Sequence, residues 1–167
     1  MRVFVRLDGG WRQLGRPSAF VMDPDRCRWI YQLEGRRIEV RSEAPAERHV
    51  LRVTVVVTEG NPVDLLFSLH TAMHGDDGIA SEPLRWEKDG DAVLVRPSPD
   101  GDVGRRFPDG AFHVAPVDAR LEFSDDAALF ADGISRNQPF LTAVARGTRR
   151  AGLEVEGRLI PSDAPGN

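Results

Sequence analysis

Two histidines and two aspartates near the middle of the chain have the residue types and spacing for acid–base chemistry. His70 and His74 are four residues apart, and Asp76 and Asp77 follow after Gly75. An imidazole that exchanges protons near neutral pH, beside a carboxylate, could supply the acid and base of an enzyme acting on sugars. One hypothesis is therefore a small epimerase or glycosidase that uses a His/Asp pair near residues 70–77.

The same histidine pair does not predict a metal centre. A zinc-binding helix would carry a glutamate between its two histidines, and the three residues between His70 and His74 include none. His70 also belongs to an alternating, strand-like segment, in which four residues span about 13 Å. A turn near Gly75 would be needed to bring the two imidazoles together. We expect no metal site and no cofactor.

Three tryptophans are candidates for carbohydrate binding. A flat indole ring can stack on the apolar side of a pyranose, while arginine or aspartate side chains bond its hydroxyl groups. Tryptophans on strands also serve simply as core or rim packing, and that interpretation stays open for each ring. The candidate carbohydrate-binding residues are Trp11, Trp29, Trp86, His70, His74, Asp76 and Asp77.

The other close pairs of aspartates are typical of turns. They lie beside glycine or in expected loops, where aspartate side chains support the turn. A glycosidase instead needs two carboxyl groups that face each other across a cleft. These pairs are Asp89 with Asp91, Asp100 with Asp102, and Asp125 with Asp126. The chain has no nucleophile elbow, phosphate loop or dinucleotide fingerprint, and we assign no catalytic residue.

Composition excludes several classes of partner. A chain of 167 residues with 41% hydrophobic residues and a formal charge of −4 fits one globular domain, and it has no field that would attract nucleic acid or anionic lipid. Cys27 is the only cysteine, so no intrachain disulfide forms. With no apolar segment of membrane-spanning length and no leader sequence at Met1, we expect a cytoplasmic protein that does not bind membranes.

Alternating apolar residues predict short β-strands along most of the chain. The only segment of helical character is 125–130, which is too short to be a stable helix unaided. We expect 97–106, rich in proline, glycine and aspartate, to be a loop. The expected strands are 3–7, 19–23, 28–33, 36–42, 48–58, 63–72, 86–88, 92–96, 111–115, 120–123, 140–145 and 153–160.

The hairpin around Glu34-Gly35 has a register that its charges determine. Ile38 and Val40 should face inward, and the charged residues 37, 39 and 41 should face out, because a shift of one residue would bury three charges. A second hairpin is predicted between 48–58 and 63–72, which are separated by a four-residue turn. We expect those two long strands to pair antiparallel.

Turn signals recur at the spacing of an all-β sandwich. We therefore expect residues 1–160 to form a single, large antiparallel β-sandwich with little helix. The last seven residues, 161–167, have the composition of a flexible C-terminal tail.

Parts of this pattern resemble a known kind of domain. The segment 29–75 is similar to the β-supersandwich, galactose-mutarotase-like domain that lies beside an (α/α)6 barrel in cellobiose-phosphorylase-like glycoside hydrolases and phosphorylases. The matching pieces are Gly35, Ile38, Glu39 and Val40, then 50–57, then 63–69, together with the closing region 132–140.

The resemblance implies a domain that packs beside a catalytic barrel and shapes its entrance or a dimer contact. The helical barrel and its general-acid carboxylate are absent from this chain, and the histidine–glutamate set of mutarotases is not matched. The favoured hypothesis is thus a non-catalytic module that binds carbohydrate or docks onto a glycoside-active catalytic domain. The alternatives are the small enzyme described above and a self-associating sandwich, such as a homo-dimer.

Overall fold

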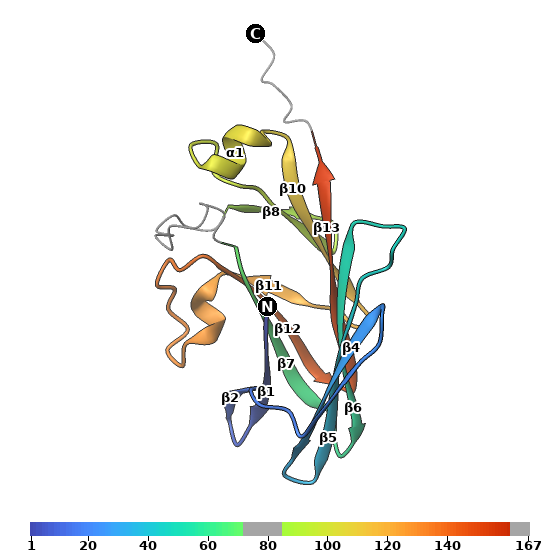
Figure 1. Cartoon of the computed structure of the whole chain (residues 1–167). Helices are drawn as coiled ribbons and strands as arrows, with labels where there is room; N and C mark the ends of the chain where they lie inside the picture. Colours follow the sequence, from blue (N-terminus) through green and yellow to red (C-terminus); the bar gives the residue numbers. More distant parts are fainter. Residues whose placement is uncertain (72–84, 161–167) are drawn as a thin grey trace.

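The computed structural model describes residues 1–71 and 85–160 of the chain (Figure 1). The candidate residues His74, Asp76 and Asp77, and the expected tail 161–167, lie outside these residues. Within them, the strands form two antiparallel sheets of five and eight strands, accompanied by two short helical segments. The expectation of an all-β sandwich with little helix is confirmed.

The five-stranded sheet has the order β11-β12-β7-β1-β2 and the eight-stranded sheet the order β3-β4-β5-β6-β13-β10-β9-β8. The strands of the first sheet are β1 (Arg2–Leu7), β2 (Gly10–Gln13), β7 (Val63–His70), β11 (Glu122–Ser124) and β12 (Phe140–Thr148). Those of the second are β3 (Ala19–Met22), β4 (Arg26–Leu33), β5 (Arg36–Glu43), β6 (Val50–Glu59), β8 (Trp86–Asp89), β9 (Ala92–Val95), β10 (Gly110–Val117) and β13 (Arg150–Leu159).

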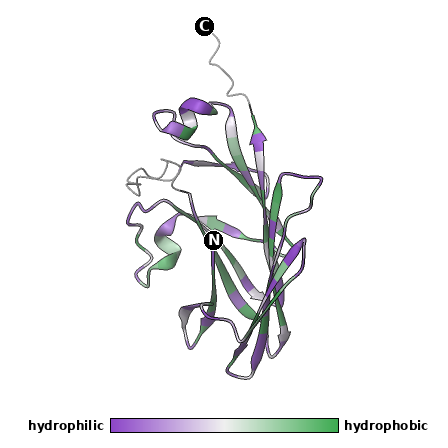
Figure 2. Ribbon diagram, in the orientation of Figure 1, coloured by the Kyte–Doolittle hydropathy of each residue, from purple (hydrophilic) through white to green (hydrophobic). Residues whose placement is uncertain are grey.

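The core lies between the two sheets, where alternate residues of each strand point inward. Val3, Val5 and Leu7 of β1 are buried, and the intervening positions are more exposed. Hydrophobic and hydrophilic residues alternate along many strands in Figure 2, as a half-buried strand requires. The largest completely buried side chain is Phe67 of β7, which belongs to this core.

The hairpin of β4 and β5 confirms the register predicted from its charges. Glu34 and Gly35 both have positive φ angles, 46° and 73°, which is the conformation of a type I′ turn. Ile38 and Val40 are buried against the other sheet. Glu39 lies on the outer face as expected, but it is buried rather than exposed, because neighbouring arginines cover it.

The prediction that the two long strands form a hairpin was wrong. β6 pairs with β5 and β13 in the eight-stranded sheet, whereas β7 pairs with β1 and β12 in the five-stranded sheet. The connection crosses between the sheets at Gly60, whose φ is +95° and where a Cβ would stand 2.6 Å from Arg36 Cγ. β6 and β7 each have one strongly apolar face. Because the crossing places the two strands in opposite sheets, these faces pack against each other across the core.

Two short helical segments accompany the strands. The 3-10 helix η1 (Asp126–Leu129) packs against β12 on the outer face of the five-stranded sheet. Leu66 of the neighbouring strand β7, which the register places on that outer face, is completely buried. The expected loop 97–106 contains the short helix α1 (Asp102–Arg106), which follows β9. No helix among the described residues is long and apolar enough to cross a membrane.

Candidate functional site

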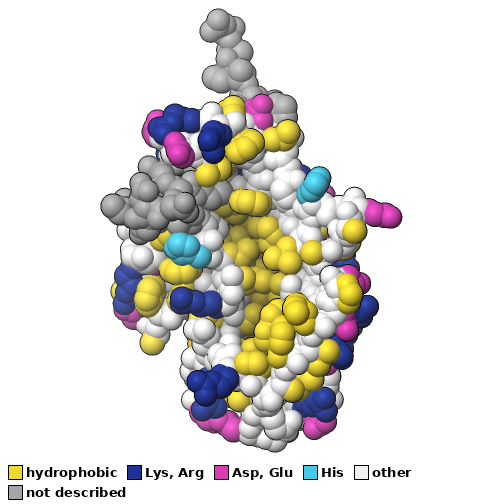
Figure 3. Space-filling view, viewed as in Figure 1, with side chains coloured by type: hydrophobic (Ala, Val, Ile, Leu, Met, Phe, Trp, Pro, Cys, Tyr) yellow, Lys and Arg dark blue, Asp and Glu magenta, His cyan; other side chains and the backbone are white. Residues whose placement is uncertain are grey.

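The two sheets differ in width, so the inner face of the larger sheet is not fully covered. The inner face follows from the register: Val53, Val55 and Leu153 are core residues, and every second residue along β6 and β13 shares their side. Leu51 and Val155 continue this side beyond the core. Figure 3 shows the consequence, a hollowed face in which hydrophobic side chains gather.

Five large hydrophobic side chains of this inner face are exposed to solvent. Phe20 and Met22 belong to the edge strand β3, and the other three lie on β6, β10 and β13. Each is between 43% and 76% exposed, although the strand register places each on the side that faces the core. We call this set the apolar band. Its members are Phe20, Met22, Leu51, Phe112 and Leu159.

Trp29 lies where the apolar band meets the core. It pairs with Phe20 on β3 and Val40 on β5, and the ring centroids of Trp29 and Phe20 are 5.3 Å apart. Trp29 also lines a cavity of about 300 Å³ together with Tyr31 and Leu51. The Tyr31 hydroxyl donates a hydrogen bond to the carbonyl of Gly15 (3.3 Å), and burial raises the pKa of this phenol.

The outer face of the same sheet is charged and paired. Glu39 accepts a hydrogen bond from Arg41 (Nε···Oε1 2.9 Å), and Arg28 lies 3.7 Å from the same oxygen. Glu154 accepts from Arg52 at 2.6 Å, and this hydrogen bond is the main reason that the pKa of Glu154 is lowered. The eight-stranded sheet therefore has one ionic face in water and one apolar face that is only partly covered.

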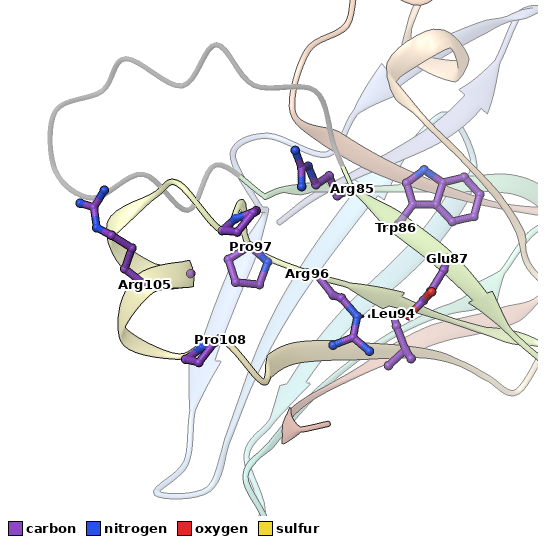
Figure 4. Close-up of a pocket in the computed structure, with 10 residues that line it drawn as sticks. Arg85, Trp86, Glu87, Leu94, Arg96, Pro97, Arg105 and Pro108 are labelled. Carbon is purple, nitrogen blue, oxygen red and sulfur yellow. Dashed lines mark hydrogen bonds and ion pairs between the residues drawn. The ribbon is translucent and has the colours of Figure 1, made fainter. Parts of the chain in front are cut away.

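Trp86 contributes to a different cavity, of about 540 Å³, between the β8–β9 hairpin and the α1 region (Figure 4). Figure 4 shows the Trp86 ring on the opposite side of β8 from Glu87, in agreement with its packing against the core. Glu87 accepts a hydrogen bond from Arg96 Nε at 3.2 Å. Arg105 is held by Asp102, so these two guanidinium groups already have carboxylate partners.

Trp11 lines a third cavity, of about 550 Å³, on the outer face of the five-stranded sheet. Arg6 and Arg146 share this cavity, and the guanidinium carbon of Arg6 lies 4.8 Å from the centre of the Trp11 ring. The three candidate tryptophans thus line three separate cavities, and the structure does not assemble them into one sugar-binding platform.

His70 is exposed at the end of β7 and packs against Phe140, with ring centroids 5.0 Å apart. The other members of the proposed acid–base group, His74, Asp76 and Asp77, lie outside the described residues. Within residues 1–71 and 85–160, no group of three or more histidine, cysteine or acidic side chains could hold a metal ion. Cys27 is partly buried on the inner side of β4.

Asp126 is an organising residue that sequence reasoning placed only in a turn pair. Its side chain is completely buried and accepts hydrogen bonds from Ser135 Oγ and from the backbone N–H groups of Arg136 (3.0 Å) and Gln138 (3.1 Å). Burial would raise the pKa of Asp126, but these three donors outweigh it and the pKa is lowered. The neighbouring Asp125 caps η1. A Ser/Asp-rich loop is a general sequence signal and did not reveal this arrangement.

Comparison with known proteins places this geometry in a carbohydrate-active context. Residues 1–155 match a family described as the glycoside phosphorylase supersandwich domain. A solved structure of a polysaccharide lyase is similar in fold, with 14% sequence identity and a TM-score of 0.50. That likeness covers 97% of this chain and 26% of the lyase, so the chain spans about a quarter of that protein. No curated protein matches the sequence.

Proposed function

Because the chain belongs to the glycoside phosphorylase supersandwich domain family, we propose that it is a non-catalytic module that docks onto the catalytic domain of a glycoside phosphorylase. The apolar band forms the docking surface. The observation that carries the proposal is the exposure of its five large hydrophobic side chains on the inner face of the eight-stranded sheet.

The composition of the band supports docking to a protein. Contiguous exposed apolar surface is unfavourable in water, and burying it against a partner supplies the main driving force of association. The band has aromatic and methionine side chains and none of the charges found on the outer face, which is the composition of an interface core. Phe20 and Met22 lie on the edge strand β3, and the band extends across the inner face to Leu159 at the end of β13.

The family supports a catalytic domain as the proposed partner. A supersandwich domain of this family is normally one part of a multidomain glycoside phosphorylase, which implies catalytic partner domains. The occupant of the band is then a catalytic domain, whether it belongs to the same polypeptide or to a separate one. The outer face stays in water, because its paired arginines and glutamates would be costly to desolvate.

Cys27 provides a direct test of docking. It is the only cysteine, it is partly buried, and its neighbours in the register are Met22 and Ser42 on the inner face. A photoactivatable maleimide cross-linker on Cys27 would therefore sit beside the band. The labelled protein is added to a lysate of the organism that encodes it and irradiated, and cross-linked peptides are identified by mass spectrometry.

The control moves the label to the other face. In the double variant Cys27→Ser/Gln32→Cys, the thiol is on exposed Gln32 of β4, whose side chain points to the outer face. Docking predicts cross-links from Cys27, but not from position 32, to peptides of a glycoside phosphorylase catalytic domain. Cross-links only between two copies of this chain would replace docking with self-association. Equal labelling from both positions, or none from Cys27, would overturn the proposal.

A further inference from the structure

A cavity lies away from the apolar band, on the other sheet. We propose that the cavity beside Trp11, on the outer face of the five-stranded sheet, binds a neutral saccharide. This proposal does not rest on docking, because it uses a different sheet and a different set of residues. The cavity, of about 550 Å³, is within the range of small-molecule sites.

The aromatic wall of the cavity is held in place. Trp11 is on β2 directly opposite Arg6 of β1, and both side chains point to the outer face. The Arg6 guanidinium lies over the indole at 4.8 Å, a cation–π contact that restricts the orientation of the ring. An indole that is already oriented loses little conformational entropy when a sugar ring stacks on it.

The charges around the cavity balance, which favours a ligand without charge. Asp64 lies 3.4 Å from Arg146 Nη1 and 4.0 Å from Arg6 Nε. Glu122 is 3.8 Å from Arg146 Nε. Two guanidinium groups are thus matched by two carboxylates, and an anionic ligand would find little net attraction. The N–H groups of a guanidinium outnumber those used in these contacts, and they suit sugar hydroxyls as donors.

The opposite wall is also built before any ligand arrives. Leu129, the last residue of η1, and Phe130, which follows it, line the cavity, and the guanidinium carbon of Arg136 lies 3.8 Å from the Phe130 ring centre. The buried Asp126 side chain ties this segment together through Ser135 and two backbone N–H groups. A buried carboxylate with three donors orders a loop that would otherwise sample many conformations.

The test follows the three indole N–H resonances by NMR while neutral hexasaccharides of glucose, with α-1,4, β-1,4 and β-1,3 linkages, are titrated into the protein. Trigalacturonate serves as the anionic probe. The expected result is movement of the Trp11 resonance with at least one neutral hexasaccharide and with no response to trigalacturonate. Because Trp11→Leu lacks the reporting indole, calorimetric titration measures its affinity, which should be at least about tenfold weaker than that of the wild type, and the matched control Trp86→Leu should bind unchanged.

A charge variant separates a saccharide site from an anion site. Asp64→Asn leaves the two arginines with one carboxylate, so the cavity becomes net positive and should begin to bind trigalacturonate. A hydrogen bond from Gly147 N (2.8 Å) also ends on Asp64, so circular dichroism must show that the variant is folded. The proposal is overturned if no neutral probe moves the Trp11 resonance, if the wild type prefers trigalacturonate, or if Trp11→Leu binds as well as the wild type. A negative result in the saccharide titrations leaves the cross-linking test of docking unaffected.

Discussion

Arg52 and Glu154 are 102 residues apart in the chain, yet they lie side by side on the outer face of the eight-stranded sheet, where Arg52 Nη2 donates to Glu154 Oε2 at 2.6 Å. Arg48 donates to the other carboxylate oxygen at 2.9 Å. One glutamate therefore joins two arginines of the same region of the chain, and the contact ties β6 to β13 at the centre of the sheet.

Glu154→Gln should lower stability by about 1 kcal/mol at neutral pH, since Arg52 is 39% exposed and water screens the pair. The pKa of Glu154 is lowered in the folded state, so its carboxylate contributes stability above the ordinary value of 4.5 and loses it as pH falls through the lowered pKa. Urea unfolding at pH 7 and at successively lower pH measures this. The difference in unfolding free energy between the wild type and Glu154→Gln should shrink below pH 4.5. A difference that stays constant with pH would show that the Glu154 carboxylate is not its source.

Asp126→Ala should destabilise the protein by about 3 kcal/mol, because it leaves the Ser135 hydroxyl and the N–H groups of Arg136 and Gln138 without their acceptor. Asp126→Asn retains one acceptor oxygen and should lose less. Thermal unfolding measures both variants, and hydrogen exchange at 134–138 should rise more in the alanine variant. Equal losses would show that the buried carboxylate is not what holds this segment.

The carboxyl group of Asp132 should titrate with a pKa of about 2. Arg136 is the main cause: its two terminal nitrogens donate to the two carboxylate oxygens at 2.9 and 2.7 Å, and the Ile134 N–H donates a further bond. Carbon-13 NMR of the side-chain carboxyl measures this value. In Arg136→Gln the pKa should return toward 3.8, so a midpoint unchanged in that variant would contradict the pairing.

Gly152→Ala should be destabilising by about 1–3 kcal/mol through overpacking. A Cβ at this position would stand 2.6 Å from the carbonyl oxygen of Val53 and 3.1 Å from Thr54 Cα, and backbone cannot give way as a flexible side chain can. Gly157 of the same strand is the matched control, because a Cβ there meets nothing within 4 Å. Denaturant unfolding should show a loss only for the first variant, and a loss of equal size in Gly157→Ala would contradict the steric explanation.

Met22→Gln combined with Leu159→Gln should change stability by no more than about 0.5 kcal/mol, because both side chains are more than 70% exposed. The same double variant should bind less of an environment-sensitive hydrophobic dye than the wild type, since it removes two members of the apolar band. Fluorescence titration measures dye binding, and thermal unfolding measures the change in stability. A large loss of stability would mean that these side chains are part of the core.

The local pattern of apolar and charged residues predicted most strands correctly, together with the hairpin turn at Glu34-Gly35 but not a hairpin between the two long strands. The turn at Glu34-Gly35 and the inward direction of Ile38 and Val40 follow from charge alternation and from Gly35, which accepts positive φ; both are properties of neighbours in the chain. The supersandwich resemblance, based on the same strands, agrees with the family that matches residues 1–155. The short helical character of 125–130 is also confirmed, as η1.

The candidate tryptophans show where local pattern stops being informative. An indole on a strand has the same sequence signature whether it faces the core, as Trp29 and Trp86 partly do, or an outer cavity, as Trp11 does. Which of these holds depends on the sheet to which each strand belongs. The proposed acid–base role of His70 with His74, Asp76 and Asp77 stays a prediction, since the last three lie outside the described residues.

By itself, the sequence determined an all-β domain, the positions of most of its strands and the buried side of strands such as 36–42, because alternation acts between residues two apart. Only the tertiary structure decided that β6 and β7 belong to different sheets, that Arg52 meets Glu154, and that eight strands face five. Strand partners are chosen by packing and hydrogen bonding between distant segments, and no local pattern encodes that choice. The unequal widths of the two sheets leave the apolar band uncovered, so the candidate docking surface itself is a product of that long-range pairing.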